Sequence, residues 1–318
     1  MKVKIVTTWG ASCGISEHSH YLVEAVQAAD ASIIHEPVTD LHPRAILESS
    51  SPCDLLVLNY QAALHSQWTP ESIRQVRDRG TPVLCVYHDS GVPNSAQCLE
   101  VCAAADAVVI HEPCDDLPQA HYWRMGVPDW QYLLLFDRAL DSWCGRRPVL
   151  GSIGFPFGWK CYDELARITG KIGWALLLIA PGATAAQIEQ WRASNPHLLV
   201  HCTFVPRAEA LSLLASCDAT AFTYVCHNTG QSGAILQGIA ARKPVIALST
   251  CRQMRALYAD PLGREAIRWC STFEEVAFAL RTCSIERCDP GIVALAEQES
   301  WQQLGKKYAA LYAEVAGR

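Results

Sequence analysis

The segment from Cys217 to Ser249 constrains the fold of this 318-residue chain more than any other part of the sequence. Residues 219–224 are apolar and β-prone, and after a polar loop Ile235 and Ile239 fall on one face of a helical pattern. A second apolar run at residues 245–248 has the length of a buried strand. This order of strand, loop, helix and strand predicts a βαβ unit of a parallel sheet.

The predicted helix of this unit begins with two glycines and a hydroxyl, in the sequence Gly230, Gln231, Ser232 and Gly233, directly after Thr229. The first backbone N–H groups of a helix have no partner within the helix, and glycines let an anion such as phosphate approach them closely. The hydroxyl of Ser232 or Thr229 can also cap the helix. An ordinary capped crossover helix explains the same residues, so this segment alone leaves both interpretations open.

Apolar runs and helical patterns alternate through most of the chain. The runs predict strands at residues 2–9, 31–37, 54–59, 82–87, 107–111, 149–153, 174–180, 198–204, 219–224 and 245–248. Such alternation is typical of an α/β fold, in which helices cover both faces of a mostly parallel sheet. Ligands of these sheets bind beyond the carboxyl ends of the strands. We therefore expect four strand ends to converge, at residues 10–14, 59–61, 88–89 and 111–112.

The length of 318 residues favours two domains. Residues 137–148 are polar and interrupted by glycine and proline, so we place the domain boundary there and expect domains at 1–147 and 148–300. Residues 301–318 form a final helix with one apolar face, made of Trp301, Leu304, Tyr308, Leu311, Tyr312 and Val315.

The charge and the apolar content exclude some classes of protein. A net charge of -6 argues against a nucleic-acid-binding surface, which needs a basic face. Although 50% of the residues are hydrophobic, no apolar run is long enough for a transmembrane segment. The chain passes directly into a strand without an apolar signal segment, so we expect a cytoplasmic protein. Peripheral contact with a membrane and the oligomeric state stay open.

The 15 cysteines contain no CxxC pair and no zinc-ribbon spacing. Several fall in predicted core segments, for example Cys85 and Cys202. In a chain of this size without an export signal, we expect reduced cysteines that act as small buried apolar residues.

The run Cys13, Gly14, Ile15, Ser16 and Glu17 and the segment from Asp218 to Ala247 resemble two segments of the retaining GT-B glycosyltransferases of the large family-four group. In that family a CGI(A/S)E run follows the first strand, and the donor-binding segment ends in LEAMAxGKPVIA. The family's two glutamates, eight positions apart, hold the sugar and ribose of the donor, and here Thr229 and Gln237 stand in their places. The residues that match are Cys13, Gly14, Ile15, Ser16, Glu17, Asp218, Leu236, Ala240, Lys243, Pro244, Val245, Ile246 and Ala247.

The resemblance implies roles for single residues on the donor side. The amide of Gly14, the side chain of Lys160 and the helix start at residues 229–233 would hold the donor diphosphate, and His88 would border the reacting sugar. Lys160 falls on the lysine of the family's GRxxxxKG run, whereas Phe155 stands where the family has an arginine. The nucleotide base and ribose would contact Phe204, Val205, Pro206 and Gln237.

The resemblance also implies an acceptor side in the first domain. Because they follow strands of the first domain or lie in its first loop, we assign to it Cys13, Glu17, Asn59, Tyr60 and His111. His88 and Lys160 are the candidates for catalytic residues. His111 and Glu112 do not continue into an HExxH pattern, and no carboxylate pair is spaced to hold an ion beside phosphates, so we expect neither a metal nor a cofactor.

As a whole, the resemblance implies a GT-B fold, with two Rossmann-like domains facing across a cleft and the final helix packed back on the first domain. It implies transfer of a sugar from a nucleotide-diphosphate sugar to a hydroxyl acceptor, with retention of anomeric configuration. Two alternatives stay open: a nucleotide-sugar epimerase on the same fold, and a non-catalytic binding or assembly protein in which the two glutamates have been lost.

Overall fold

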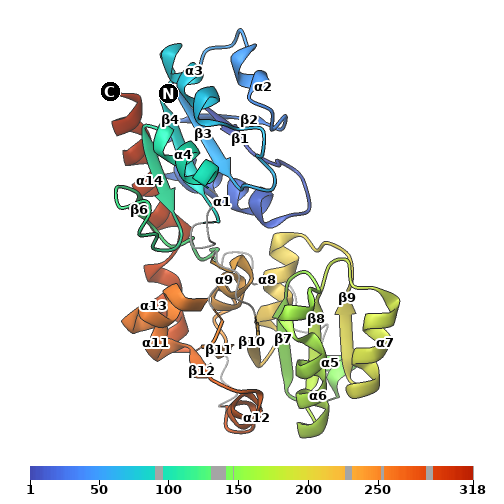
Figure 1. Ribbon diagram of the computed structural model, residues 1–318. Coiled ribbons are helices and arrows are strands. Elements are labelled where there is room, and N and C mark those ends of the chain that lie inside the picture. Colours follow the sequence, from blue (N-terminus) through green and yellow to red (C-terminus); the bar gives the residue numbers. More distant parts are fainter. Residues whose placement is uncertain are drawn as a thin grey trace. The chain divides into compact units, whose positions relative to one another are not determined.

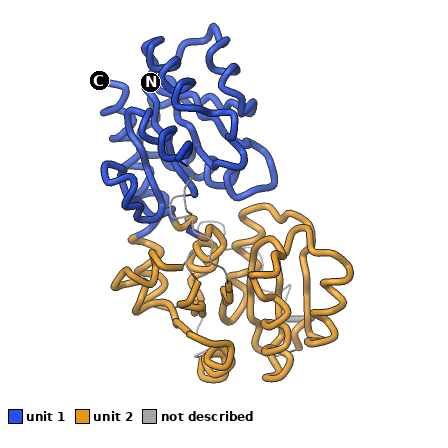
Figure 2. The backbone as a smooth tube through the Cα atoms, viewed as in Figure 1, with its two compact units in different colours: residues 1–126, 228–231, 299–318 blue, residues 127–227, 232–298 orange. Residues whose placement is uncertain are grey.

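The structure is a computed structural model that describes residues 1–89, 96–129, 141–145, 147–225, 231–251, 254–283 and 289–317. It forms two compact units, coloured separately in Figure 2. Unit 1 comprises Met1–Gly126, Asn228–Gln231 and Glu299–Arg318, and unit 2 comprises Val127–His227 and Ser232–Gln298. The first segment of unit 1 ends at Gly126, whereas we expected the domain boundary at residue 147. The two positions differ because the polar residues at 137–148 lie well after β6 (His121–Tyr122), the last strand of unit 1.

Unit 1 is built on a six-stranded parallel sheet in the order β2-β1-β3-β4-β5-β6 (Figure 1). All six residues of β3 and all five of β4 are buried, as expected where helices cover both faces of a parallel sheet. The strands are β1 (Lys2–Val6), β2 (Ile34–Val38), β3 (Leu55–Tyr60), β4 (Val83–Tyr87), β5 (Ala107–Ile110) and β6 (His121–Tyr122).

Two apolar cores lie on opposite faces of this sheet. One contains residues of α1 (Gly14–Ala29) and the C-terminal helix α14 (Trp301–Ala316), and the other contains residues of α3 (Pro70–Asp78) and α4 (Ala96–Ala104). Gly305 of α14 lets the two helices of the first core approach, because a Cβ there would collide with the carbonyl oxygen of Ala25. A short helix, α2 (Arg44–Leu47), follows β2. Thr69 and Ser72 form a capping box at the start of α3.

Unit 2 contains a second six-stranded parallel sheet, in the order β12-β11-β10-β7-β8-β9. Its strands are β7 (Val149–Ile153), β8 (Ala175–Ile179), β9 (Leu198–His201), β10 (Ala219–Phe222), β11 (Val245–Leu248) and β12 (Arg268–Cys270). Its helices are α5 (Asp141–Cys144), α6 (Tyr162–Ile172), α7 (Ala185–Ser194), α8 (Arg207–Ala215), α9 (Gly233–Ala240), α10 (Arg255–Ala259), α11 (Pro261–Ala266), α12 (Phe273–Arg281) and α13 (Pro290–Gln298).

Each sheet has one point at which the strand order reverses direction. In unit 2 the chain builds β7, β8 and β9 outward, then returns to place β10 against the other side of β7. In unit 1 the reversal lies between β1 and β3. Open parallel sheets bind ligands beyond the carboxyl ends of the strands at such switch points. Each unit therefore has its own candidate binding edge.

The predicted α/β fold and the βαβ unit that opened the sequence analysis are both confirmed, the latter as β10, α9 and β11. Three predicted strands run two or more residues past the observed end: β1 ends at Val6 instead of at residue 9, β9 at His201 instead of at residue 204, and β10 at Phe222 instead of at residue 224. Cys202 therefore lies beyond β9 and is exposed, which corrects its assignment to the core, whereas Cys85 is buried as expected. None of the described cysteines is part of a disulfide bond. None of the described helices combines the length and the apolar character that crossing a membrane requires.

Candidate functional site

At the carboxyl edge of unit 1, helix α1 begins directly after the loop that follows β1. Cys13 is its N-cap, and its sulfur accepts a hydrogen bond from the amide of Ser16 at 3.4 Å. Gly14 is the first helical residue and is exposed; no described atom comes within 4 Å of the position a Cβ would take, and its φ angle is not in the left-handed region. Unlike Gly305, Gly14 is not required by packing. This leaves room for a ligand at the helix start.

A buried hydrogen-bond network connects α1 to the ends of β3 and β4. The hydroxyl of Ser19 donates to the carbonyl oxygen of Ile15 at 2.8 Å and accepts from the Asn59 amide nitrogen at 2.6 Å. Because that nitrogen is the donor, the side-chain oxygen of Asn59 is the acceptor that faces Nε2 of His88. Nε2 of His88 must therefore carry the proton, and Nδ1 carries the lone pair. Asn59 thus fixes the tautomer and the orientation of His88.

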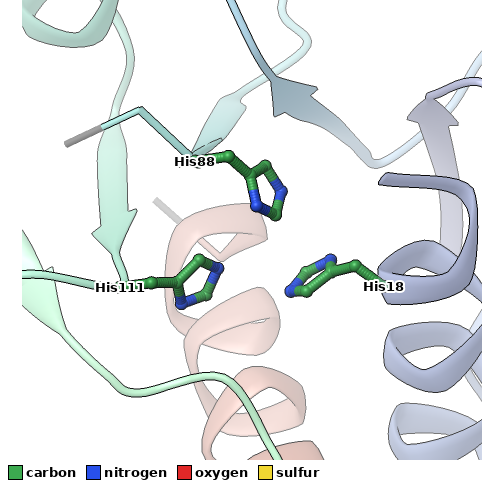
Figure 3. A group of neighbouring side chains, drawn as sticks. All are labelled: His18, His88 and His111. Atoms are coloured by element: carbon green, nitrogen blue, oxygen red, sulfur yellow. The ribbon is translucent and has the colours of Figure 1, made fainter. Parts of the chain in front are cut away.

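His88 belongs to a group of three histidines that converge at this edge, as Figure 3 shows. His18 comes from the second turn of α1, His88 follows β4 and His111 follows β5. The ring centroids are 4.5 Å apart for His18 and His88, and 5.1 Å apart for the other two pairs. His18 and His111 are buried, with exposed fractions of 5% and 1%, and His88 is partly buried.

Burial keeps these imidazoles neutral. Loss of hydration lowers the pKa of His18 and of His88 well below 6.5, and their histidine neighbours lower both pKa values further. Burial also lowers the pKa of His111 to about 4. Nδ1 of His111 lies 2.8 Å from the carbonyl oxygen of Trp123, which can only accept, so Nδ1 donates and Nε2 carries the lone pair. Within the described residues, Nε2 of His111 and both ring nitrogens of His18 have no hydrogen-bond partner.

The structure separates the residues assigned to the acceptor side. Cys13, Glu17 and His111 lie around the start of α1 and the end of β5, where polar side chains gather. The assignment of two others needs correction. Asn59 is 0% exposed and its amide is engaged in the network, so it positions His88 instead of reaching an acceptor. Tyr60 is 2% exposed and its hydroxyl lies 3.7 Å from the sulfur of Cys98 in the α3–α4 core.

At the carboxyl edge of unit 2, Lys160 ends a short 3₁₀ helix (Gly158–Lys160) in the connection between β7 and α6 and is only 6% exposed. Its amine donates to the hydroxyl of Tyr224 at 3.0 Å and lies 4.2 Å from the centre of the Tyr224 ring and 5.1 Å from that of Trp159. Gly154 is needed here, because its φ of 137° suits only glycine and a Cβ would collide with the lysine amine. A solvated surface lysine is therefore excluded, and the chain builds a specific place for this cation.

The loop that holds Lys160 is tied to the loop that leads towards α9. The amide of Val225 donates to the carbonyl oxygen of Trp159 at 2.7 Å, and the hydroxyl of Thr223 donates to the carbonyl oxygen of Lys160 at 3.4 Å. These two loops follow β7 and β10, which are the neighbouring strands at the switch point of unit 2. Lys160 is thus positioned at the edge where an α/β sheet binds its ligand.

Helix α9 begins at the predicted position. Ser232 is its N-cap and Gly233 its first residue, but the Ser232 side chain makes no capping hydrogen bond. Gly233 is exposed, and no described atom comes within 4 Å of the place of its Cβ. The side-chain oxygen of Gln231 accepts from the amide of Met125 at 2.6 Å within unit 1, so that oxygen is already engaged. Thr229 and Gly230 lie outside the described residues.

The residues assigned to the nucleotide base and ribose also lie in unit 2. Phe204 is 40% exposed and Pro206 is the exposed N-cap of α8, whereas Val205 is buried. Only a backbone contact is therefore open to Val205. Gln237 is partly buried on α9, one turn after the helix start.

Two residues of these edges were not singled out from the sequence, namely His18 and Tyr224. His18 could have been found as a polar residue that shares the apolar face of the predicted first helix with Ile15 and Leu22, which are both buried in α1. Tyr224 was assigned only to a strand, but β10 ends at Phe222 and Tyr224 lies in the loop that holds the lysine.

No model of a protein family matches the chain, and no curated protein matches it by sequence. Solved structures match it along its whole length. HepE from Anabaena, in complex with UDP and glucose, has a TM-score of 0.73 at 15% identity, and the match covers 99% of this chain and 100% of that chain. Trehalose-6-phosphate synthase OtsA gives 0.69 at 10% identity, covering 99% of each chain. AviGT4, a glycosyltransferase involved in avilamycin A biosynthesis, gives 0.62 at 14% identity, covering 100% of this chain and 98% of that chain.

These similarities define the fold class. The two six-stranded parallel α/β units match the GT-B architecture of the three solved structures. The GT-B fold expected from the sequence is thereby confirmed.

Proposed function

We propose that this protein is a glycosyltransferase that moves a sugar from a nucleotide-diphosphate sugar to a hydroxyl acceptor, with retention of anomeric configuration, as in the family-four group that it resembles. The structural neighbours support a nucleotide-sugar donor, since HepE was solved with UDP and glucose and with UDP-glucose. UDP-glucose is therefore the first donor to test.

The observation that carries the proposal is the burial of Lys160 at the switch point of unit 2. The departing nucleoside diphosphate gains negative charge as the glycosidic bond breaks, and a fixed cation stabilises that charge more in the transition state than in the bound donor. Phe155 provides no second cation in this loop. Lys160 would therefore act as the catalytic cation on the leaving group.

The start of α9 would supply the remaining diphosphate contacts. Its first amide groups have no partner within the helix, and Gly233 leaves space in front of them. Because a helix N-terminus carries partial positive charge, it stabilises an anion without a metal ion. These contacts make a metal-independent reaction without a cofactor the simplest form of the proposal.

In unit 1, His88 would border the sugar. Its Nδ1 lone pair can accept a hydrogen bond from a sugar hydroxyl, because Nε2 is held by Asn59. A neutral imidazole suits this role, since a protonated ring would have no acceptor.

The proposal is tested by incubating the protein with UDP-glucose and other nucleotide sugars, with and without a chelator, and following the products. Slow release of the sugar with its anomeric configuration retained supports the transferase. Inversion at a ring carbon of the donor would instead identify an epimerase. Donor binding without any turnover would favour a binding protein, for which the replacement of the family's two glutamates by Thr229 and Gln237 is the specific argument.

A further inference from the structure

Two features of the His18–His88–His111 cluster are not explained by sugar recognition through His88 alone. One nitrogen from each ring lies within 4.8 Å of the other two. The side chain of His18 is only 5% exposed, and neither of its ring nitrogens forms a hydrogen bond with any of the described residues. A buried polar group without a hydrogen bond costs about 1–3 kcal/mol, so a protein that tolerates it usually gains something in return.

The hydrogen bonds around the cluster leave lone pairs directed towards its interior. Nδ1–H of His111 donates to the carbonyl oxygen of Trp123, so Nε2 is available, and Figure 3 shows one nitrogen of His111 directed towards the other two rings. Nε2–H of His88 donates to Asn59, so Nδ1 is available. Histidines that bind metal ions are held in this way, with the other ring nitrogen donating to a carbonyl or amide oxygen.

We propose that His18, His88 and His111 form a binding site for a transition-metal ion of the zinc type, with three imidazole ligands and one open coordination position. Neutral imidazole suits Zn²⁺, Co²⁺, Ni²⁺ and Cu²⁺, whereas Mg²⁺ and Mn²⁺ prefer carboxylate oxygens. Tetrahedral coordination at a Zn–N length of about 2.0–2.1 Å places ligand nitrogens ~3.4 Å apart. Ring rotations that move the nitrogens by about 1 Å therefore close the site, because they start within 4.8 Å of one another.

The site has a consequence for turnover that rests on the proposed function. A metal ion on Nδ1 of His88 occupies the lone pair that would accept the sugar hydroxyl. Zinc-type ions therefore inhibit glycosyl transfer, and a chelator restores it, whereas Mg²⁺ has no effect. This pattern agrees with a reaction that needs no metal ion for the diphosphate.

The experiment uses the full chain after treatment with a chelator and removal of that chelator. Co²⁺ is added first, because imidazole ligation in a tetrahedral site gives visible absorption bands without the intense near-ultraviolet bands of thiolate ligation. This distinction matters because the described cysteines are not in disulfide bonds and thiolates also bind zinc-type ions. Zn²⁺ affinity is then measured by competition with a chromogenic chelator.

We expect one equivalent of Zn²⁺ to bind per chain, and His18→Gln and His111→Gln each to weaken it by about 100-fold or more, given that even outer-shell changes cost 10–100-fold. The matched control is His35→Gln, which removes a histidine whose ring nitrogens also lack partners among the described residues but which lies on β2, outside the cluster. Circular dichroism and thermal melting show whether each variant folds.

The proposal is overturned by thiolate bands in the Co²⁺ spectrum, by the absence of binding tighter than about millimolar, or by unchanged affinity in folded His18→Gln and His111→Gln. Turnover is a separate measurement. Zinc binding without inhibition of an active enzyme would remove only the consequence for His88, and zinc binding to a protein that turns over no nucleotide sugar would count against the proposed function while leaving the metal site intact.

Discussion

At the carboxyl edge of unit 1 the buried polar groups include three imidazoles that burial keeps neutral, whereas at the same edge of unit 2 they include a lysine amine against two aromatic rings. Both edges lie at the point where the strand order of the sheet reverses, and both contain a helix that begins with an exposed glycine, Gly14 or Gly233. The architecture alone therefore does not set the chemistry. The side chains at the strand ends and on the helices that follow them set the chemistry, and they suit an anion in unit 2 and hydroxyl groups or a metal ion in unit 1.

Replacing Lys160 tests whether unit 2 binds the phosphates of the donor. Lys160→Ala should weaken binding of a nucleoside diphosphate by roughly 10- to 100-fold, since a charge-assisted contact contributes about 1.5–3 kcal/mol. Gly233→Val should have a similar effect, because its side chain would stand in front of the helix amides. Calorimetry with UDP, GDP, ADP and dTDP measures this.

Two controls accompany these variants. Lys171→Ala removes an exposed lysine at the end of α6 and should leave the affinity for the diphosphate unchanged. Binding of nucleosides without phosphate should change little in Lys160→Ala. If folded Lys160→Ala binds the diphosphates as tightly as the parent protein, the phosphate site lies elsewhere.

Replacing His88 tests whether unit 1 contributes to turnover without contributing to the affinity for UDP. His88→Ala should lower turnover by about 5- to 13-fold, in line with the loss of one hydrogen bond of about 1–1.5 kcal/mol in the transition state. The affinity for UDP should change little, because the phosphate contacts are assigned to Lys160 and α9. Steady-state kinetics and calorimetry on the same samples separate the two effects. A parallel loss of UDP affinity and thermal stability would instead assign His88 to structure alone.

Much of this architecture could be predicted from the sequence, because buried strands of a parallel sheet are continuous apolar runs between turns. The limits of β7 and β11 agree residue by residue with the runs at 149–153 and 245–248. The prediction failed at β9, where the run at 198–204 continues past the last paired residue, His201. Apolar or β-prone residues beyond a strand end do not differ in sequence from those within it.

The candidate site was harder to predict, because side-chain direction decides which strand-end residues meet. Asn59 and Tyr60 are neighbours at the end of β3, and successive strand residues point to opposite faces. Asn59 therefore reaches α1 and His88, whereas Tyr60 enters the α3–α4 core. His18 was missed for a related reason: a single sequence does not tell whether a histidine on a buried helix face meets other histidines.

Acidification should lower the unfolding free energy, because unit 1 contains buried neutral histidines such as His35. Burial lowers the pKa of His35 from 6.5 to about 4 in the folded protein, so the unfolded chain binds more protons between these values. Stability therefore rises with pH in this window and is lost as the pH falls below 6.5. Between pH 7.5 and pH 6, His35 alone should cost at most about 0.8 kcal/mol of unfolding free energy. Urea denaturation of the parent protein and of His35→Gln at both pH values measures this difference, and an equally steep pH dependence in the variant contradicts it.

Gly14→Ala should give the smallest effect on stability. It tests whether the start of α1 contacts UDP in addition to the start of α9. No described atom lies within 4 Å of the added methyl group, and alanine is favoured over glycine in a helix by up to about 1 kcal/mol, so the unfolding free energy should stay the same or rise slightly. Gly305→Ala is the contrasting variant, since its methyl group collides with the Ala25 carbonyl, and overpacking of this kind costs about 1–3 kcal/mol. If folded Gly14→Ala also binds UDP more weakly, a ligand uses the space in front of α1, because the chain itself does not need the glycine there. An unchanged affinity for UDP would confine the phosphate contacts to unit 2, and a clear loss of stability would show that Gly14 serves the fold.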